Sequence, residues 1–198
     1  MGHMITRVCL TIEDWTGRPG KIAGWLILAL VLAVCVSVLA AFLRISVFVD
    51  YETALPLIGR AFSASTVADL QWHLFAVMVM LGGAFALQGN RHVQVDFLSS
   101  RFSPRLQRLV TVAGDLCLLL PFCGFMVWYG WKFAMTAYHI GEGSAYGGMT
   151  DRWVIKMIIP LGFGLIALNA LARSLRLLIE AVDSSAAATV IPGSHPHG

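Results

Sequence analysis

Residues 89–104 read GNRHVQVDFLSSRFSP, and this stretch separates two long apolar runs of a 198-residue chain. It brings together Arg91, His92, Asp96 and Arg101, although only 13% of the chain is charged. A short polar connection between two apolar runs that are each long enough to cross a bilayer is typical of a membrane protein.

The composition places the chain in lipid. Soluble domains average about 25% charged residues, whereas this chain has 13% charged and 58% hydrophobic residues and a mean hydropathy of +0.75. A spanning helix needs roughly 20 mostly apolar residues, so a chain of this length holds about four. We expect an all-α membrane protein with four transmembrane helices. The net charge of +3 gives no indication of nucleic-acid binding.

Four apolar runs define the expected domain organisation. A single four-helix membrane domain is expected over residues 22–178, with helices over residues 22–43, 67–88, 104–138 and 157–178. Residues 1–21 are expected to form a cytoplasmic N-terminal segment, with residues 1–4 as a possible cloning remnant, and residues 179–198 a flexible tail. The first run is longer than the 7–15-residue core of a cleaved signal peptide, which favours a retained helix.

The third run has a clear start signal. Ser103 can cap a helix, and Pro104 suits the first helical position, where a missing N–H is harmless. About 35 residues would follow, or roughly 52 Å of helix, which exceeds the hydrocarbon thickness. We expect this helix to protrude, to tilt or to bend at Pro121.

Lysines and arginines indicate the orientation. Nine of them fall on the side that holds both termini and the 89–108 connection, and five fall on the other side. The positive-inside rule therefore predicts that both termini are cytoplasmic.

The 89–104 connection itself has an amphipathic pattern. Val95, Leu98 and Phe102 recur at helical spacing, which predicts an interfacial segment between the second and third helices, with its arginines among anionic headgroups. A solvated basic turn would explain the arginines equally well but the apolar spacing less well. The residues expected to contact lipid or another subunit here are Arg91, His92, Asp96, Arg101 and Arg105.

Asp115 lies inside the third apolar run. A carboxylate there is costly unless it faces protein or water, so an ion or proton relay is one hypothesis. The alternative is a structural ion pair with an arginine such as Arg108 or Arg91. The pair is favoured because we expect no second buried acid for a relay.

Two histidines raise a different class of function. His73 and His139 both fall toward the outer side and could ligate a haem in a cytochrome-type electron-transfer subunit. His139 lies at or beyond the end of its apolar run, however, and there is no second inward-facing pair. An interfacial hydrogen bond beside Trp72 is the simpler interpretation of His73.

Several motifs occur in a fixed order along the chain. The most specific are His-Val-x-Val-Asp at residues 92–96 and Glu-x-Ser-x-x-Gly-Gly at residues 142–148. Further matches are Trp72-His73-Leu74-Phe75, Gly82, Gly114-Asp115, Pro121-Phe122, and Arg152-Trp153 with Lys156 and Pro160. Together these motifs resemble a known family, the small DctQ-like membrane subunit of tripartite ATP-independent periplasmic (TRAP) transporters. Ala145-Tyr146 and Thr150 depart from the Asp-Pro and the Pro associated with this subgroup around the double glycine.

The resemblance implies a bacterial inner-membrane scaffold subunit. Its partners would be a larger membrane subunit and a soluble periplasmic binding protein, in a complex that imports organic acids with an ion gradient, generally sodium. The residues expected to contact the large subunit are Trp72, His73 and Asp115. Those expected to contact the periplasmic partner are Glu142, Ser144, Gly147, Gly148, Arg152, Trp153 and Lys156.

Nothing in the sequence indicates catalysis. It has no phosphate-binding Gly-x-x-x-x-Gly-Lys, no His-Glu-x-x-His and no nucleophile elbow. No enzyme activity and no cofactor are therefore expected. The paired glycines at 82–83, and those at 162 and 164, are expected to permit close helix packing.

Overall fold

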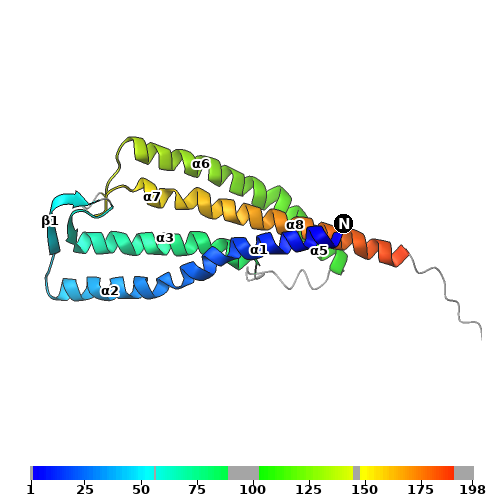
Figure 1. Cartoon of the computed structure of the whole chain (residues 1–198), viewed down its shortest axis with the longest axis horizontal. Helices are drawn as coiled ribbons and strands as arrows, with labels where there is room; N and C mark the ends of the chain where they lie inside the picture. Colours follow the sequence, from blue (N-terminus) through cyan, green and yellow to red (C-terminus); the bar gives the residue numbers. More distant parts are fainter. Residues whose placement is uncertain (1, 56, 89–102, 145–147, 190–198) are drawn as a thin grey trace, which may run out of the picture.

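The computed structural model describes residues 2–55, 57–88, 103–144 and 148–189, which form an elongated helical bundle with a small β-hairpin at one end (Figure 1). The elements are α1 (Gly2–Gly24), α2 (Leu26–Phe42), β1 (Val47–Leu55), β2 (Gly59–Ser63), α3 (Ala64–Gln88), α5 (Pro104–Gly114), η1 (Asp115–Leu119), α6 (Leu120–His139), α7 (Trp153–Lys156) and α8 (Ile158–Thr189). The N-terminus and the end of α8 lie together, opposite the hairpin. We call these the termini end and the hairpin end.

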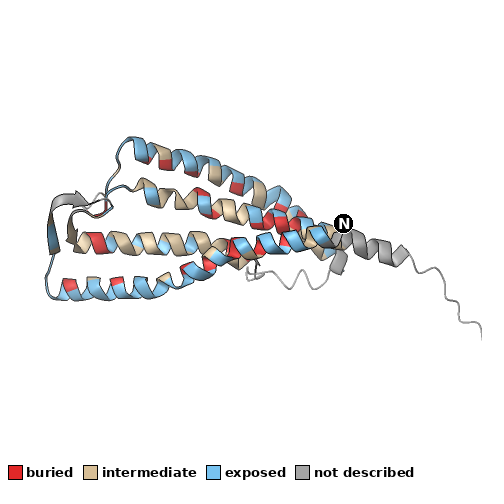
Figure 2. Cartoon of the chain, in the orientation of Figure 1, coloured by how far each residue is buried: buried red, intermediate tan, exposed pale blue. Residues whose placement is uncertain are grey.

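The prediction of four spanning helices is confirmed. Four helical stretches are long and apolar enough to cross a bilayer: Met4–Phe42, Ala64–Leu87, Leu106–His139 and Trp153–Glu180. Within the most apolar window of each stretch, no more than 22% of the residues are buried inside the chain. α2 is exposed along almost its whole length, with Ala33 and Ala40 as its buried residues (Figure 2). Such outward-facing apolar surface fits a lipid solvent.

The first helical stretch is longer than the sequence suggested. Residues 2–24 form α1, which packs against α3 and α8, and the chain turns at Trp25 before α2 begins. A Cβ atom on Gly20 would lie 2.6 Å from the carbonyl oxygen of Leu81, so only glycine allows this close approach to α3. Hydropathy alone placed the start of the first helix near residue 22, because the buried face of α1 is made of small and polar residues.

The third span begins as expected and then changes its winding. The Ser103 hydroxyl accepts a hydrogen bond from the N–H of Leu106 at 3.4 Å, and Pro104 is in the first turn, which confirms the predicted cap. η1 is a π-helical turn, in which the N–H of Leu120 donates to the carbonyl of Asp115. This wide turn lies just before Pro121, which has no backbone N–H to donate to the preceding turn.

The hairpin was not predicted. No element was predicted between residues 43 and 67, but β1 and β2 pair antiparallel, with Val47 opposite Ser63 and Leu55 opposite Gly59. The β-branched and aromatic residues at 47–51 are typical of a strand. The hairpin also contacts the loop before α7, because the N–H of Thr150 donates to the carbonyl of Leu57 at 2.9 Å.

The fourth span is longer than predicted at both ends. It begins with the single turn α7 and continues through α8 to Thr189, beyond Leu178 and into the stretch expected to be a tail. The rest of that tail, from residue 190, lies outside the described residues. The expected interfacial segment at 89–102, with Arg91, His92, Asp96 and Arg101, also lies outside them, and Arg105 falls in the first turn of α5.

Small residues bring the helices together. Ala84, Ala134 and Ala170 are fully buried. A Cβ atom on Gly83 would lie 2.8 Å from Ile166, and one on Gly162 would lie 2.8 Å from the carbonyl oxygen of Met80. The expectation of close packing is therefore confirmed at Gly83 and Gly162, whereas Gly82 and Gly164 face open space.

Candidate partner-contact sites at the two ends of the bundle

Asp115 forms a buried ion pair at the termini end. It is 5% exposed, and η1 directs its carboxylate toward α8. Arg173 donates to both carboxylate oxygens, with Nη2–Oδ1 at 2.5 Å and Nε–Oδ2 at 2.9 Å. The hydroxyl of Ser174 lies 3.3 Å from Oδ2. Such a two-bond pair is among the stronger charge-assisted interactions and fixes the relative orientation of the two helices.

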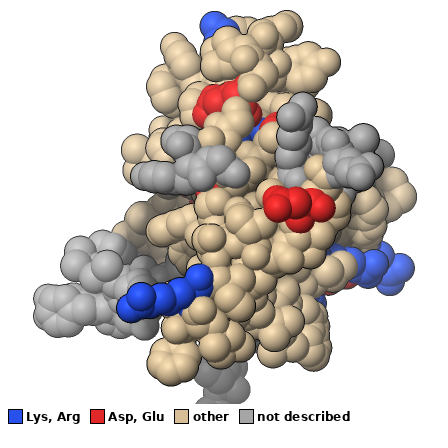
Figure 3. Space-filling view, turned by 90° about the vertical axis from the view of Figure 1, so that its left-hand side faces the viewer, with Lys and Arg blue, Asp and Glu red and all other residues tan. Residues whose placement is uncertain are grey.

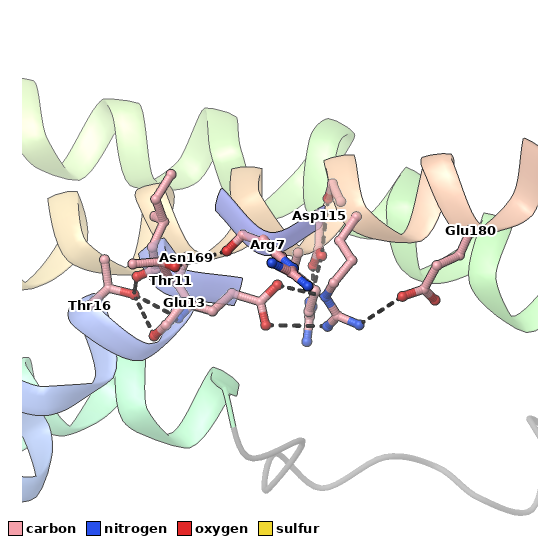
Figure 4. Close-up of polar contacts among 11 residues, drawn as sticks. Arg7, Thr11, Glu13, Thr16, Asp115, Asn169 and Glu180 are labelled. Carbon is pink, nitrogen blue, oxygen red and sulfur yellow. Dashed lines mark hydrogen bonds and ion pairs between the residues drawn. The ribbon is translucent and has the colours of Figure 1, made fainter. Parts of the chain in front are cut away.

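A second ion pair lies one turn further along α8. The Nε and Nη2 atoms of Arg176 donate to the two carboxylate oxygens of Glu13 at 2.9 and 3.2 Å. Glu13 is 5% exposed and belongs to α1. Arg176 Nη1 also lies 3.3 Å from Glu180. Figure 4 shows Glu13 and Asp115 reaching toward α8 from different helices. We call Glu13, Asp115, Arg173 and Arg176 the buried charge cluster.

Asn169 extends the contact between α1 and α8. Its side chain is fully buried, and Nδ2 donates to the Thr16 hydroxyl at 2.8 Å and to the Glu13 carbonyl at 3.3 Å (Figure 4). Its Oδ1 atom has no hydrogen-bond partner within the described part of the chain. α1 is therefore joined to α8 by side-chain hydrogen bonds over more than one turn.

These contacts correct two expectations. Asp115 does pair with an arginine, but the arginine is Arg173 rather than Arg108 or Arg91. The chain also has a second buried acid, Glu13, which the sequence analysis missed because residues 1–21 were placed outside the bundle. One pattern in the sequence could have revealed the burial of Glu13. Small and polar residues recur at helical spacing on one face of this segment, at Cys9, Glu13, Thr16 and Gly20.

At the hairpin end, the loop before α7 is held by a polar pair. The Lys156 ammonium lies 2.5 Å from Glu142 Oε2 and 3.8 Å from the centre of the Phe133 ring. The N–H of Arg152 donates to the carbonyl of Glu142 at 3.0 Å. Glu142 thus accepts from Lys156 at its carboxylate and from Arg152 at its backbone carbonyl. The N–H of Ser144 closes the loop by donating to the carbonyl of Met149 at 2.9 Å.

Gly148 lies directly against α3. A Cβ atom at this position would come within 3.0 Å of the Ser65 carbonyl oxygen and of Asp69 Cγ. The same carboxylate accepts the N–H of Met149 at 3.1 Å. Asp69 therefore fastens the loop to the first turns of α3, a role that the sequence analysis did not assign. Gly147 lies outside the described residues.

An open groove of about 630 Å³ lies beside this contact. Its lining residues come from two turns of α3 and from the residue before α7: Ser65, Ala68, Asp69, Trp72, His73 and Arg152. The groove thus brings together Trp72 and His73, expected at the large subunit, with Arg152, expected at the periplasmic partner. Trp153 lies apart from it, with its ring 5.3 Å from that of Tyr138. We call this the α3 groove.

The two histidines considered for haem have separate local contacts. His73 Nδ1 lies 2.6 Å from the Asp69 carbonyl oxygen. Because a carbonyl can only accept, Nδ1 carries the proton in this arrangement. The His139 ring, at the end of α6, lies 5.7 Å from that of Tyr138.

The hairpin-end face carries charges of both signs. In Figure 3, acidic groups lie toward the middle of this face and most basic groups lie toward its rim. Exposed Asp50 and Asp151 and exposed Arg44 and Lys132 belong to this end of the bundle.

Comparison with known proteins agrees with the motifs and the helix count. A search of curated proteins found no match. The family model described as "Tripartite ATP-independent periplasmic transporters, DctQ component" matches residues 53–180, from within β1 to α8. The match covers both the hairpin-end loop and the arginines of the buried charge cluster. The chain therefore belongs to the DctQ component family of the tripartite ATP-independent periplasmic transporters.

Proposed function

We propose that this small transporter subunit is a fixed scaffold in the bacterial inner membrane, which holds the large membrane subunit in position during transport. The observation that supports this most directly is the buried charge cluster. Glu13 on α1 and Asp115 on η1 are both bonded to α8, through Arg176 and Arg173. Two ion pairs on neighbouring turns resist sliding of α1 or the third span along α8.

The lateral surface supplies the proposed contact with the large subunit. α6 exposes large aromatic side chains, of which Phe122, Phe125, Trp128, Tyr129, Trp131 and Phe133 are each more than 50% exposed. Trp72 is 72% exposed on α3 and, with His73, is retained in this contact. Asp115 is given an internal role instead, because its carboxylate is buried and bonded to α8.

The hairpin end supplies the proposed contact with a periplasmic binding protein. This assignment rests on the lysine and arginine count, which favours a cytoplasmic termini end. The loop and first turn at this end then face the periplasm or its membrane surface. The proposed contact residues are Glu142, Ser144, Gly148, Arg152, Trp153 and Lys156, and Gly147 is included from its position in the sequence. On the cytoplasmic side, Arg91, His92, Asp96, Arg101 and Arg105 are proposed to contact lipid headgroups or the large subunit.

The transport reaction is proposed from the family. The complex would import an organic acid together with sodium ions, and the solute would make little contact with this chain. The family assignment gives no support to the cytochrome alternative.

Co-expression with a large TRAP membrane subunit from the same genome tests this proposal. A detergent-stable complex of the two subunits is expected on size-exclusion chromatography. Clean separation of the small subunit when both proteins are well expressed would contradict the scaffold role.

A further inference from the structure

The α3 groove contains a cation and an anion within one open cavity. Arg152 and Asp69 both line it, together with Trp72, His73 and the hydroxyl-bearing Ser65. The volume of about 630 Å³ lies in the range of small-ligand sites. A groove lined by both charges favours a ligand that itself carries both.

Asp69 and Arg152 differ in the partners that their charged groups already have. Asp69 Oδ2 accepts the N–H of Met149 at 3.1 Å, so the carboxylate is fixed in place but retains capacity for a further donor. Among the described residues, no carboxylate lies within ion-pair distance of the half-buried Arg152 guanidinium. Arg152 is therefore available for an external anion, and a guanidinium matches phosphate oxygens well.

The groove lies at the depth of a membrane interface. Gln71, next to Trp72, donates to the Ala33 carbonyl and the Ser37 hydroxyl of α2 at 3.0 and 2.6 Å. Ser37 is five residues from the end of α2 at Phe42, or about 7.5 Å at helical rise. Trp72 is 72% exposed at this level, where tryptophan is enriched beside lipid headgroups. The groove therefore lies at the level along the bundle where lipid headgroups are expected.

We propose that the α3 groove binds the headgroup of a zwitterionic phospholipid that carries a primary ammonium, of the phosphatidylethanolamine type. Its phosphate binds Arg152, its ammonium donates to Asp69, and its glycerol region lies against Trp72. An anionic phospholipid without an amine would be repelled by Asp69. A trimethylammonium headgroup could not donate hydrogen bonds to the carboxylate. The bound lipid would lie at the edge of the contact proposed for Trp72 and His73.

The binding assay uses the purified full-length chain in nanodiscs and does not depend on transport or on the large subunit. Nanodiscs containing equal parts phosphatidylethanolamine, phosphatidylcholine and phosphatidylglycerol are exchanged into detergent, and the retained lipids are counted by native mass spectrometry. We expect retention of phosphatidylethanolamine. Arg152→Ala should reduce its affinity about tenfold, which is the effect of losing one charge-assisted hydrogen bond.

Matched variants separate this site from general lipid binding. Asp69→Asn keeps an oxygen for the N–H of Met149 but removes the charge, so it should lower retention of phosphatidylethanolamine relative to phosphatidylglycerol. Arg152→Lys should largely retain binding. Lys132→Ala removes an exposed cation outside the groove and should have no effect. Equal retention of all three lipids, or no response to Arg152→Ala and Asp69→Asn, would overturn the proposal.

The assembled transporter tests whether a protein occupies the groove instead. A photo-crosslinking benzophenone residue replaces Ala68, an exposed residue of the groove. In a complex with the large subunit, irradiation should give an adduct with the mass of the phospholipid. A crosslink to the large subunit or to the binding protein would show that the groove is a protein interface and would reject the lipid.

Discussion

The guanidinium of Arg173 on α8 holds the carboxylate of Asp115 on η1 through two hydrogen bonds of 2.5 and 2.9 Å. Both side chains are largely withdrawn from the surroundings, with 12% and 6% of their areas exposed. The pair resolves the problem of an acid inside an apolar span, because each charge is neutralised where it is buried.

Breaking this pair should be costly. Asp115→Ala leaves the Arg173 guanidinium buried without its main acceptor, and we expect a loss of about 3–5 kcal/mol in the free energy of unfolding. Unfolding by denaturing detergent, followed by circular dichroism, measures the change. The exposed pair Arg18–Asp14, with side chains 62% and 44% exposed, is the control. Arg18→Ala should cost less than about 1 kcal/mol, and equal losses for the two variants would contradict the assigned burial.

Adjacent acids on α1 provide a second test. Glu13 is buried against Arg176, whereas Asp14 is partly exposed. Glu13→Ala should loosen α1 from α8 and raise amide hydrogen exchange over residues 4–20, because the contact contributes both a salt bridge and side-chain packing. Asp14→Ala should leave that exchange nearly unchanged. If the two variants exchanged alike, α1 would not be anchored through Glu13.

The loop before α7 offers a matched pair of glycines. Gly148→Ala places a Cβ atom against Ser65 and Asp69, whereas Gly143 has open space around it. We expect Gly148→Ala to displace Met149 from Asp69, with a local loss of about 1–3 kcal/mol for the unpaired groups, and to weaken binding of the periplasmic protein to the assembled transporter. Surface plasmon resonance on nanodiscs measures this affinity. Gly143→Ala should bind normally, and normal binding by both would remove the loop from the docking surface.

Cysteine labelling tests the orientation. In a background without Cys9, Cys35, Cys117 and Cys123, a cysteine at exposed Thr150 should react with a membrane-impermeant maleimide in intact spheroplasts. A cysteine at Ser99, in the connection predicted to be cytoplasmic, should react only after lysis. The reverse pattern would invert the topology and place the binding-protein contact at the wrong end.

Hydropathy and capping rules predicted the parts of this fold that depend on local composition. The four spans are visible because each has an apolar stretch that no soluble helix needs, and the start at Ser103 follows from hydrogen-bond capping of the first turn. The family motifs at residues 142–148 also marked a loop whose Gly148 is tightly packed.

The missed features depend on pairing across the chain. Glu13 and Arg176 are 163 residues apart in sequence, and nothing local indicates that they meet. Asp69 reaches Met149 across 80 residues, so its role at the loop is equally invisible from its own helix. The hairpin was missed for a different reason: the residues between the first two spans were not assessed for strand patterns, although 47–51 are rich in β-branched and aromatic residues.

The π-helical turn at Asp115–Leu119 has a consequence for every residue that follows it. Accommodating one additional residue in a helix changes the phase of the downstream half by about 100° relative to the upstream half. Asp115 can therefore point at Arg173 while Phe125, Trp128 and Tyr129 of α6 remain exposed. Deleting one residue from this turn would rotate the downstream half of the helix back by about 100°. The exposed aromatic side chains of α6 would then lie on a different side of the molecule, and the subunit would present a different surface to the membrane.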